Sequence, residues 1–512
     1  MHRCLSIPEI LRMIFEELLR CNAPDLKALA RLAQTCRGFS DLALDILWKD
    51  LNSAIPLLKS FPPHIWEISG TTHQKTFRFR LPIKAADWDR VLGYAARIRK
   101  ISLGYGIPQL EVLELLSLSL PAEHFLPNLQ GLRWLPNDPR VFPYIRLFTS
   151  PNLTVIELSI DSSLASSSLL SLLASRFSYI TDLTLRWSGG DGPTLDTLGS
   201  LVSALTHLER LCVPHLDPSA YQHLPSVATL RHLSLNNFSS FPDDSGSWSH
   251  TDPTFSGLSH LRLRSDTITP TATALLSTFS NTPLQSFRCE SGCIPSVVTV
   301  RELCLALAGG CSRSHLRQVY LELGSEELDN PTLATITPDV ISPLLIFSNL
   351  RKVRVEAGTS FALDDAFCTA LATAWPRLEA LTLNTNSAHG ALWPSTVGLL
   401  TLTAFARHCP LLAELSITLN AQGFPDALPH PQAQRVSQRA LKYLDVARSS
   451  IDSPFDVARF LSRTFPALTA INSWYLLRNE INPTKWTEVQ KLLPMLVAIR
   501  KEEEIYWRAQ AL

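Results

Sequence analysis

The chain of 512 residues carries almost no net charge and few charged residues. Lys plus Arg and Asp plus Glu are equal at 46 each, and charged residues make up only 18% of the sequence. A balance of this kind gives no overall attraction to nucleic acid or to an anionic membrane surface, although it allows local charged patches. We therefore expect neither nucleic acid nor membrane as a partner.

Cysteine and long apolar runs are also scarce. The ten cysteines are scattered and form no dense disulfide framework, which favours a reducing compartment such as the cytoplasm or the nucleus. No apolar run reaches the roughly 18 residues of a membrane span. Arg3, Pro8 and Glu9 interrupt the apolar stretch that a secretory signal would need. We therefore expect an intracellular protein.

One apolar sequence motif, which we call the apolar phrase, recurs many times along the chain. It reads apolar-x-x-Leu-x-x-Leu-x-Leu, as in residues 205–213 (LTHLERLCV) and 227–235 (VATLRHLSL). Aligned along the chain, its second apolar residues recur every 24 to 34 residues. They stand at Leu129, Leu153, Ile180, Leu205, Leu230, Leu258, Leu284, Leu316, Leu350, Leu378, Leu412, Leu441 and Leu468, with Ile98 as an earlier member.

This period indicates a repeat protein, because so long a chain exceeds one ordinary core unless the core is extended. The Leu-x-Leu part is typical of a short strand, and the segments between phrases have helical spacing. The pattern resembles a leucine-rich repeat with a strand and a helix in each unit. We expect an α/β solenoid, a curved parallel sheet with helices on its convex side.

The phrase also sets the expected domain boundaries. The solenoid should cover residues 96–483, and residues 51–95 are a linker or divergent first repeats. Residues 484–512 have an amphipathic pattern, which we interpret as a C-terminal helix that caps the last repeat. The alternative for this helix is a partner-binding role. Residues 1–50 differ from the rest and form a separate helical module.

Within that module, residues 5–50 have the pattern of three short helices. Ser6 is placed to cap the first, followed by Pro8 near its start. Asp25 is placed to begin the second helix, and Trp48 stands near the end of the third. A segment this short buries little area, and more apolar residues line its helices than one small core can hold. Surplus apolar surface indicates a partner.

The ordered anchors of this module resemble an F-box. They are residues 7–15 (IPEILRMIF), 25–26 (DL), 36–39 (CRGF) and 47–48 (LW), with Ile7 where the family has leucine. The resemblance implies docking on the Skp-type adaptor of a cullin-RING ubiquitin ligase. Carried over by position, the expected adaptor contacts are Ile7, Pro8, Ile10, Leu11, Ile14, Phe15, Leu26, Leu29, Leu32 and Trp48. The alternative is that these residues pack only on the first repeats.

A target protein should bind the concave face, which the outward residues of the strands line. Neighbouring strands lie about 4.8 Å apart, so outward residues of successive phrases form rows. Arginine and tyrosine are enriched at binding hot spots, and arginine can grip carboxylate or phosphate with two hydrogen bonds. The expected patch consists of Arg262, Arg264, Arg288, Tyr320 and Arg354.

Two interpretations of this patch remain open. In the first, it binds an acidic or phosphorylated segment of the target. In the second, it is a solvated ladder, because Glu290, Glu322 and Glu356 stand in the neighbouring row and can neutralise the arginines across the strands.

The usual motifs of catalysis and metal binding are absent from the sequence. There is no phosphate-binding loop, no H-E-x-x-H and no G-x-S-x-G. Cys289, Cys293, Cys304 and Cys311, with His315, form the one candidate zinc cluster, but only the first two have suitable spacing. Buried structural thiols explain Cys289 and Cys304 better. We expect no cofactor, no metal and no enzymatic activity, since an enzyme would need a deep pocket with convergent titratable groups.

Together, these features predict a substrate-recognition subunit of a Skp/cullin/F-box (SCF) type ubiquitin ligase. The helical module would dock on the adaptor, and the repeats would hold an unknown protein substrate. Two partners on one frame raise the effective concentration of one near the other. The alternative is a repeat scaffold for protein interaction that has no connection with ubiquitin, whose N-terminal helices only cap the solenoid.

Overall fold

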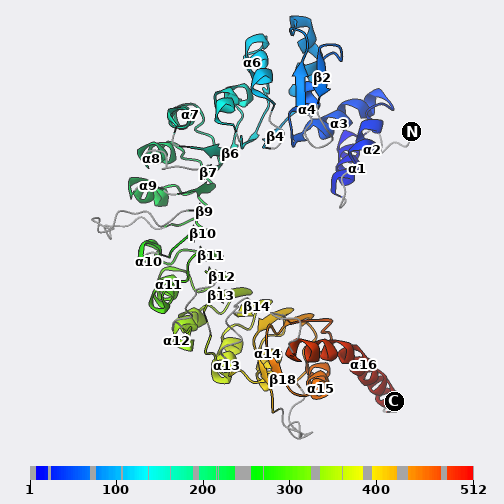
Figure 1. Ribbon diagram of the computed structural model, residues 1–512, viewed down its shortest axis with the longest axis vertical. Helices are drawn as coiled ribbons and strands as arrows, with labels where there is room; N and C mark the ends of the chain where they lie inside the picture. Colours follow the sequence, from blue (N-terminus) through cyan, green and yellow to red (C-terminus); the bar gives the residue numbers. More distant parts are fainter. Residues whose placement is uncertain are drawn as a thin grey trace. The chain divides into compact units, whose positions relative to one another are not determined.

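The computed structural model divides into two compact units, Met1–Leu230 and Arg231–Leu512, which we describe separately (Figure 1). The structure describes residues 7–20, 25–69, 76–104, 108–136, 138–161, 163–187, 195–214, 216, 218–236, 255–268, 270–324, 335–359, 361–383, 395–423, 436–473 and 481–510. Ser6, the expected cap of the first helix, lies outside these residues.

The first unit begins with three helices, α1 (Pro8–Arg20), α2 (Leu26–Leu32) and α3 (Arg37–Trp48). Asp25 caps α2 as its position predicts, because its carboxylate accepts a hydrogen bond of 2.9 Å from the backbone N–H of Ala28. The three helices share one small core, and we call them the N-terminal module. Its buried side chains are Leu11, Phe15, Leu29, Leu42, Ala43 and Ile46.

The repeats of the first unit form a parallel sheet with helices on one face (Figure 1). Its strand order is β1 (Asp50–Leu51), β4 (Lys100–Leu103), β5 (Gly131–Trp134), β6 (Val155–Ile160), β7 (Asp182–Trp187) and β8 (Arg210–Val213). The connecting helices are α6 (Leu110–Ser119), the 3₁₀-helix η3 (Pro139–Phe148), α7 (Leu164–Arg176), α8 (Leu195–Ala204), α9 (Pro218–His223) and η4 (Leu224–Ser226).

Residues 51–95 contain folded elements that the repeat pattern does not predict. An antiparallel hairpin, β2 (Trp66–Ser69) with β3 (Thr76–Phe79), stands beside α4 (Ile55–Leu58), η2 (Ala85–Asp87) and α5 (Trp88–Ala95). Aromatic rings hold it together: Phe61 meets Phe79 and Trp88 edge to face at 5.3 and 5.0 Å. Because β1 pairs with β4, the sheet already begins at residue 50.

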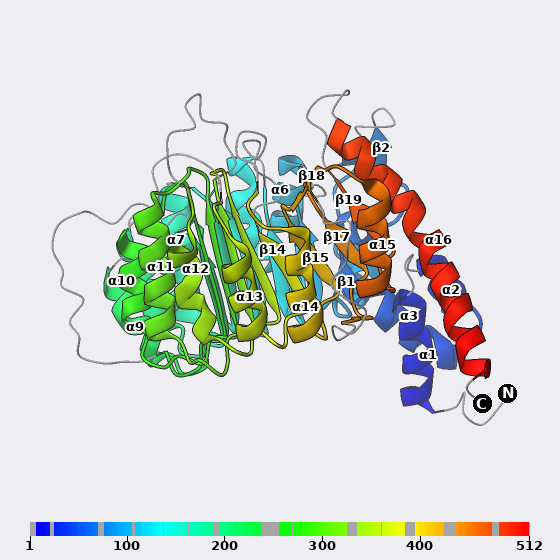
Figure 2. The same ribbon diagram turned by 90° about the horizontal axis from the view of Figure 1, so that it is seen from below.

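The second unit continues the same design, and within its described residues nine strands lie in one parallel sheet (Figures 1 and 2). They are β9 (His232–Leu235), β10 (His260–Ser265), β11 (Ser286–Ser291), β12 (Gln318–Leu323), β13 (Lys352–Ala357), β14 (Ala380–Leu383), β15 (Glu414–Ile417), β17 (Tyr443–Asp445) and β19 (Ala470–Asn472). We call the face of this sheet that lies opposite the helices its open face.

Helices cover the other face of the second unit's sheet (Figure 2). They are α10 (Pro270–Ser277), α11 (Val297–Gly310), α12 (Pro338–Ile341), η5 (Ser342–Ile346), α13 (Asp365–Ala374), η7 (Leu399–Thr401), α14 (Leu402–His408) and α15 (Pro454–Thr464), and β16 (Asn420–Ala421) pairs with β18 (Ser450–Ile451). The last helix, α16 (Ile481–Gln510), buries Trp486, Val489 and Leu493 and touches α15, β18 and β19. It therefore covers the last repeat, beginning three residues before the expected cap.

The apolar phrase sets the register of both sheets. Each aligned residue except Leu205 lies two positions before a strand and is buried, from Ile98 before β4 to Leu468 before β19. One alignment needs correction: β7 pairs with β8 through Asp182 and Arg210, so Leu208 rather than Leu205 takes that place. Both are leucines three residues apart, which is why the phrase alone did not separate them. The predicted leucine-rich-repeat solenoid of α/β class is confirmed by this strand order.

Several connections are 3₁₀-helices rather than the α-helices that the pattern suggests. Pro143 lies inside η3, whereas Pro225 and Pro343 stand at the start of η4 and η5, directly after α9 and α12. Proline has no N–H to donate and clashes with the preceding turn of an α-helix, so these segments form tighter, shorter turns. None of the helices among the described residues is long and apolar enough to cross a membrane.

The described cysteines are mostly structural. Cys289 and Cys304 are buried, as expected for core thiols, and no group of three possible metal-ligating side chains gathers among the described residues. Burial raises the pKa of the thiols of Cys289, Cys304 and Cys311 to about 12. These thiols stay protonated near neutral pH and are therefore unreactive.

We expect a thiol reagent at pH 8 to label exposed Cys293 in the folded protein and to leave Cys289 unmodified, which peptide mapping would show. Unfolding should make both react at similar rates. Stability should fall as pH rises from 9.0, the ordinary thiol pKa, toward about 12, because the unfolded chain loses these protons first. Rapid native labelling of Cys289 would contradict this assignment.

Candidate functional site

The N-terminal module exposes an apolar face on α1. Ile7, Ile10 and Ile14 follow one another at helical spacing and are all exposed, as is Pro8. Leu26, at the start of α2, is exposed as well. We call these five residues the apolar face of the module. Aliphatic side chains gathered on one small module are the kind of surface that partner proteins cover.

Three of the other five expected adaptor contacts lie inside the module. Leu11, Phe15 and Leu29 are buried at 5%, 2% and 0% exposure. Phe15 meets Phe39 edge to face at 5.5 Å, which ties α1 to α3. These three side chains are not accessible to an adaptor in this structure. The list of expected adaptor contacts therefore becomes shorter by these three residues.

Leu32 and Trp48 are intermediate cases. Leu32 packs against the module's core and is partly buried. Trp48 stacks on Tyr94 of α5 with ring centroids 4.5 Å apart. For Trp48, the structure matches the alternative in which the residue packs on the first repeats.

Met13 belongs to the exposed surface of α1 and was missed by sequence reasoning. It is 71% exposed and lies three positions after Ile10 and one before Ile14. The helical period that predicts Ile10 and Ile14 also includes position 13, so a count that included methionine would have found it.

A clamp holds the N-terminal module on the first repeats. The Arg97 guanidinium donates to the Asp41 carboxylate at 2.8 Å and to the Asp41 backbone carbonyl at 3.0 Å, and it also binds Asp45. Partial burial alone would lower the pKa of Arg97, but its bonds to the two aspartates outweigh this and raise that pKa. Arg97 lies between the end of α5 and the start of β4, so the clamp joins α3 to the beginning of the repeats.

We expect Arg97→Ala to loosen this attachment without unfolding the module. Because the aspartates are partly exposed, the loss should be modest, about 1 kcal/mol. Amide hydrogen exchange in α3 and β1 should accelerate, while exchange in β10–β13 stays unchanged. An unaltered α3 exchange rate in the variant would contradict the clamp.

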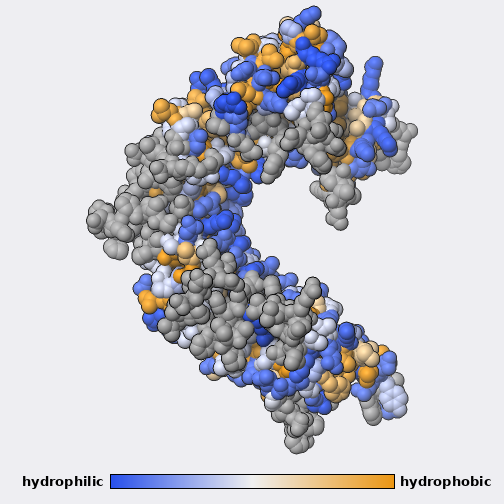
Figure 3. Space-filling view, viewed as in Figure 1, coloured by the Kyte–Doolittle hydropathy of each residue, from blue (hydrophilic) through white to orange (hydrophobic). Residues whose placement is uncertain are grey.

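The second candidate surface is the open face of the second unit. Pairing of β10 to β13 places Arg262, Arg288, Tyr320 and Arg354 in one row, as predicted. The neighbouring row, read from the same register, contains Arg264, Glu290, Glu322 and Glu356. Figure 3 shows hydrophilic residues gathered where strands β9–β12 lie.

Each arginine of this patch is bound to a glutamate. Arg262 lies 2.7 Å from Glu290, while Arg264 is looser at 3.8 Å from the same carboxylate. Arg288 bridges Glu290 and Glu322, with its guanidinium 3.1 Å from the second. The four arginines and three glutamates form a continuous network, completed by Arg354 with Glu322 at 3.6 Å and Glu356 at 2.5 Å.

The structure therefore favours the ladder interpretation for most of the patch. Burial alone would raise the pKa of Glu290, but its bond to Arg262 and the charges of Arg262 and Arg288 outweigh this and lower it. Glu290 is thus fixed as a carboxylate beneath the arginines. Tyr320 lies beside Arg288, whose guanidinium carbon is 5.7 Å from the ring centroid.

The first unit has a similar ladder that sequence reasoning did not single out. Glu157 on β6 binds Arg133 of β5 at 3.1 Å and Arg186 of β7 at 2.6 Å. Asp182 and Arg210 form a further pair at 3.5 Å. This ladder could have been predicted from the sequence, because charged residues recur at the outward positions of these strands.

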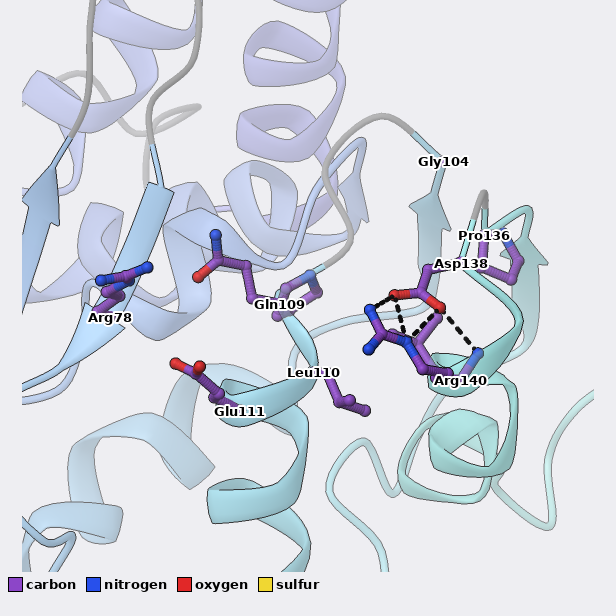
Figure 4. A pocket seen from close by; sticks show the side chains of 10 residues that line it. Arg78, Gly104, Gln109, Leu110, Glu111, Pro136, Asp138 and Arg140 are labelled. Carbon is purple, nitrogen blue, oxygen red and sulfur yellow. Dashed lines mark hydrogen bonds and ion pairs between the residues drawn. The ribbon is translucent and has the colours of Figure 1, made fainter.

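A pocket of about 500 Å³ lies in the first unit, beyond the ends of β4 and β5 (Figure 4). Arg78 reaches it from β3, and Gln109 and Glu111 stand at the start of α6. On the other side Asp138 and Arg140 form an ion pair at 2.8 Å, and hydrogen bonds from Arg140 lower the pKa of Asp138. The two side chains bind each other and are open to solvent. The ion pair alone therefore explains the lowered pKa of Asp138, and no catalytic role is needed.

No protein-family model matches the chain, and no curated protein matches it. Among solved structures it is similar to an internalin of Listeria monocytogenes, at 14% identity over 64% of this chain and 76% of that one, with a TM-score of 0.33. It is also similar to TLR13 in its complex with ssRNA13, at 14% identity over 74% of this chain and 53% of that one, with a TM-score of 0.30. The fold assignment depends on the strand order and repeat spacing described above, and these comparisons add nothing to it.

Proposed function

We propose that this chain is the substrate-recognition subunit of an SCF-type ubiquitin ligase in the cytoplasm or the nucleus. The observation that carries the proposal is the apolar face of the N-terminal module. Its four aliphatic side chains and Pro8 stay exposed although the module already has a closed core. The order of its anchor residues resembles an F-box, whose partner is the Skp-type adaptor. The chain would contribute binding and positioning, not catalysis.

The repeat solenoid supports the second half of this proposal, the binding of a target protein. The open face of its second unit carries polar rows on paired strands, a surface typical of protein-interaction repeats. The clamp at Arg97 and the stack of Trp48 on Tyr94 hold the module on the first unit's repeats. Rate enhancement would then come from proximity, because one chain holds both partners.

Affinity purification from cells with the proteasome blocked tests the proposal. We expect the wild-type chain to capture a Skp-type adaptor and a cullin together with a trapped target. A variant with Pro8→Asp and Ile10→Asp should lose the adaptor and the cullin but keep the target. The alternative, a repeat scaffold unconnected with ubiquitin, predicts that neither form captures the adaptor, and that result would overturn the proposal.

A further inference from the structure

The Arg–Glu network on the open face of the second unit places its charges at different depths. Its cations lie outermost: the side chains of Arg264 and Arg262 are 64% and 45% exposed. The carboxylate that they share, Glu290, is only 14% exposed. The surface therefore presents guanidinium groups to a partner, although they are neutralised from beneath.

The residues of the network divide into two roles. Arg288 is occupied on several sides, by Glu290, Glu322 and the Tyr320 ring, and Arg354 is held by Glu322 and Glu356. Arg262 and Arg264 contact only Glu290 within the network, so further N–H donors of their five-donor guanidinium groups are available to a partner. Glu290 holds these two in place and reduces the entropy lost when they bind an anion.

The net charge decides which anion fits. Four arginines and three glutamates leave one excess positive charge in the network. A carboxylate carries one negative charge, whereas a phosphate ester carries about −1.5 to −2 at neutral pH. A phosphate would also lie close above the Glu290 carboxylate, a like charge that opposes it.

We propose that Arg262 and Arg264 form a carboxylate-binding site for an acidic, non-phosphorylated segment of a partner protein, and that Glu290 sets this preference. This inference rests on the target-binding part of the proposed function. Arg262 and Arg264 lie two positions apart on one strand, about 7 Å. Because both guanidinium groups converge on the Glu290 carboxylate, the matching partner segment presents one carboxylate within reach of both.

Fluorescence anisotropy with three synthetic peptides tests this site. One peptide carries a single glutamate, the second has phosphoserine at that position and the third has glutamine. The wild-type chain should bind the glutamate peptide most tightly, and added salt should weaken that binding. Arg262→Gln with Arg264→Gln should lower the affinity about tenfold or more, whereas Arg186→Gln, a matched control at an exposed arginine of the first unit's ladder, should change it less than threefold.

Glu290→Gln is the decisive variant, because it removes the like charge and keeps the side chain's size. It should raise affinity for the phosphoserine peptide about tenfold and reverse the order of the two anionic peptides. Arg264→Gln alone, a change at an exposed side chain, repeats the test if the double variant is unstable. Tighter wild-type binding of the phosphoserine peptide, or no binding of any peptide, would overturn the inference.

Adaptor binding by the same variants separates this inference from the proposed function. All of them should bind the purified adaptor as the wild type does, since the N-terminal module is unchanged. Peptide binding without adaptor binding would support the carboxylate site and reject the ligase role. The chain would then be a scaffold for protein interaction. Adaptor binding with failed peptide preferences would reject the site alone.

Discussion

Replacing Ile10 and Ile14 together by aspartate is expected to abolish capture of the Skp-type adaptor while the chain stays folded. Both side chains are exposed in the structure, so the substitutions should hardly change the stability of the free chain. In the complex, each new carboxylate would be buried without a partner, at a cost of several kcal/mol. Loss of affinity by about 100-fold or more follows. Size-exclusion chromatography of the mixed purified proteins would show the complex disappear.

Two comparison variants separate binding from folding. Leu118→Asp introduces the same charge at an exposed position of α6 and should leave the adaptor complex intact. Phe15→Ala removes a buried ring of the module's core and should destabilise it by about 3–5 kcal/mol. If the Ile10 and Ile14 variant melts like Phe15→Ala, or if it still binds the adaptor, the exposed face is not the contact surface.

Gln438→Leu should cause the largest loss of stability in the second unit. The buried Gln438 side chain donates to the backbone carbonyls of Cys409 and Leu412 at 3.2 and 2.7 Å. It also accepts hydrogen bonds from the N–H groups of Ala440 and Leu441 at 3.1 and 2.8 Å. One side chain thus satisfies four backbone groups that link two successive repeats. Leucine has a similar volume but makes none of these bonds, and only the Cys409 carbonyl keeps another one, of 3.2 Å from the backbone N–H of Leu412.

The expected cost is on the order of 3–5 kcal/mol, because unsatisfied buried polar groups cost about 1–3 kcal/mol each and do not add fully. Urea unfolding followed by hydrogen exchange in β15 and β17 measures it. Gln422→Leu, at an exposed position, serves as the matched control and should change stability by less than about 0.5 kcal/mol. An unchanged midpoint for Gln438→Leu would contradict this account of the turn.

The repeat fold could be predicted from the sequence because its signal is redundant. The same phrase recurs many times, so one misaligned member does not change the predicted fold. The pairing of β7 with β8 then shows that Leu205 was the misaligned residue. The hairpin β2–β3 could not be predicted this way, because it occurs once and is held by contacts among aromatic residues distant in sequence, such as Phe61 with Phe79.

The candidate sites show the limit of pattern reasoning. Ile10, Leu11, Ile14 and Phe15 all belong to one broad apolar stripe, and no property of the residues separates the exposed pair from the buried pair. Only the packing of α1 against α2 and α3 decides this. Likewise, the rows of arginines and glutamates follow from strand alternation, but which arginine stays available depends on how Glu290 is shared.

Isothermal titration of the purified chain with a purified Skp-type adaptor tests the central claim most directly, that the apolar face of the N-terminal module is a docking surface. The account predicts a complex of one chain with one adaptor and a negative heat-capacity change, since apolar surface is buried on binding. The absence of any complex at micromolar concentrations, or a complex that forms equally well with the Ile10 and Ile14 variant, would contradict it.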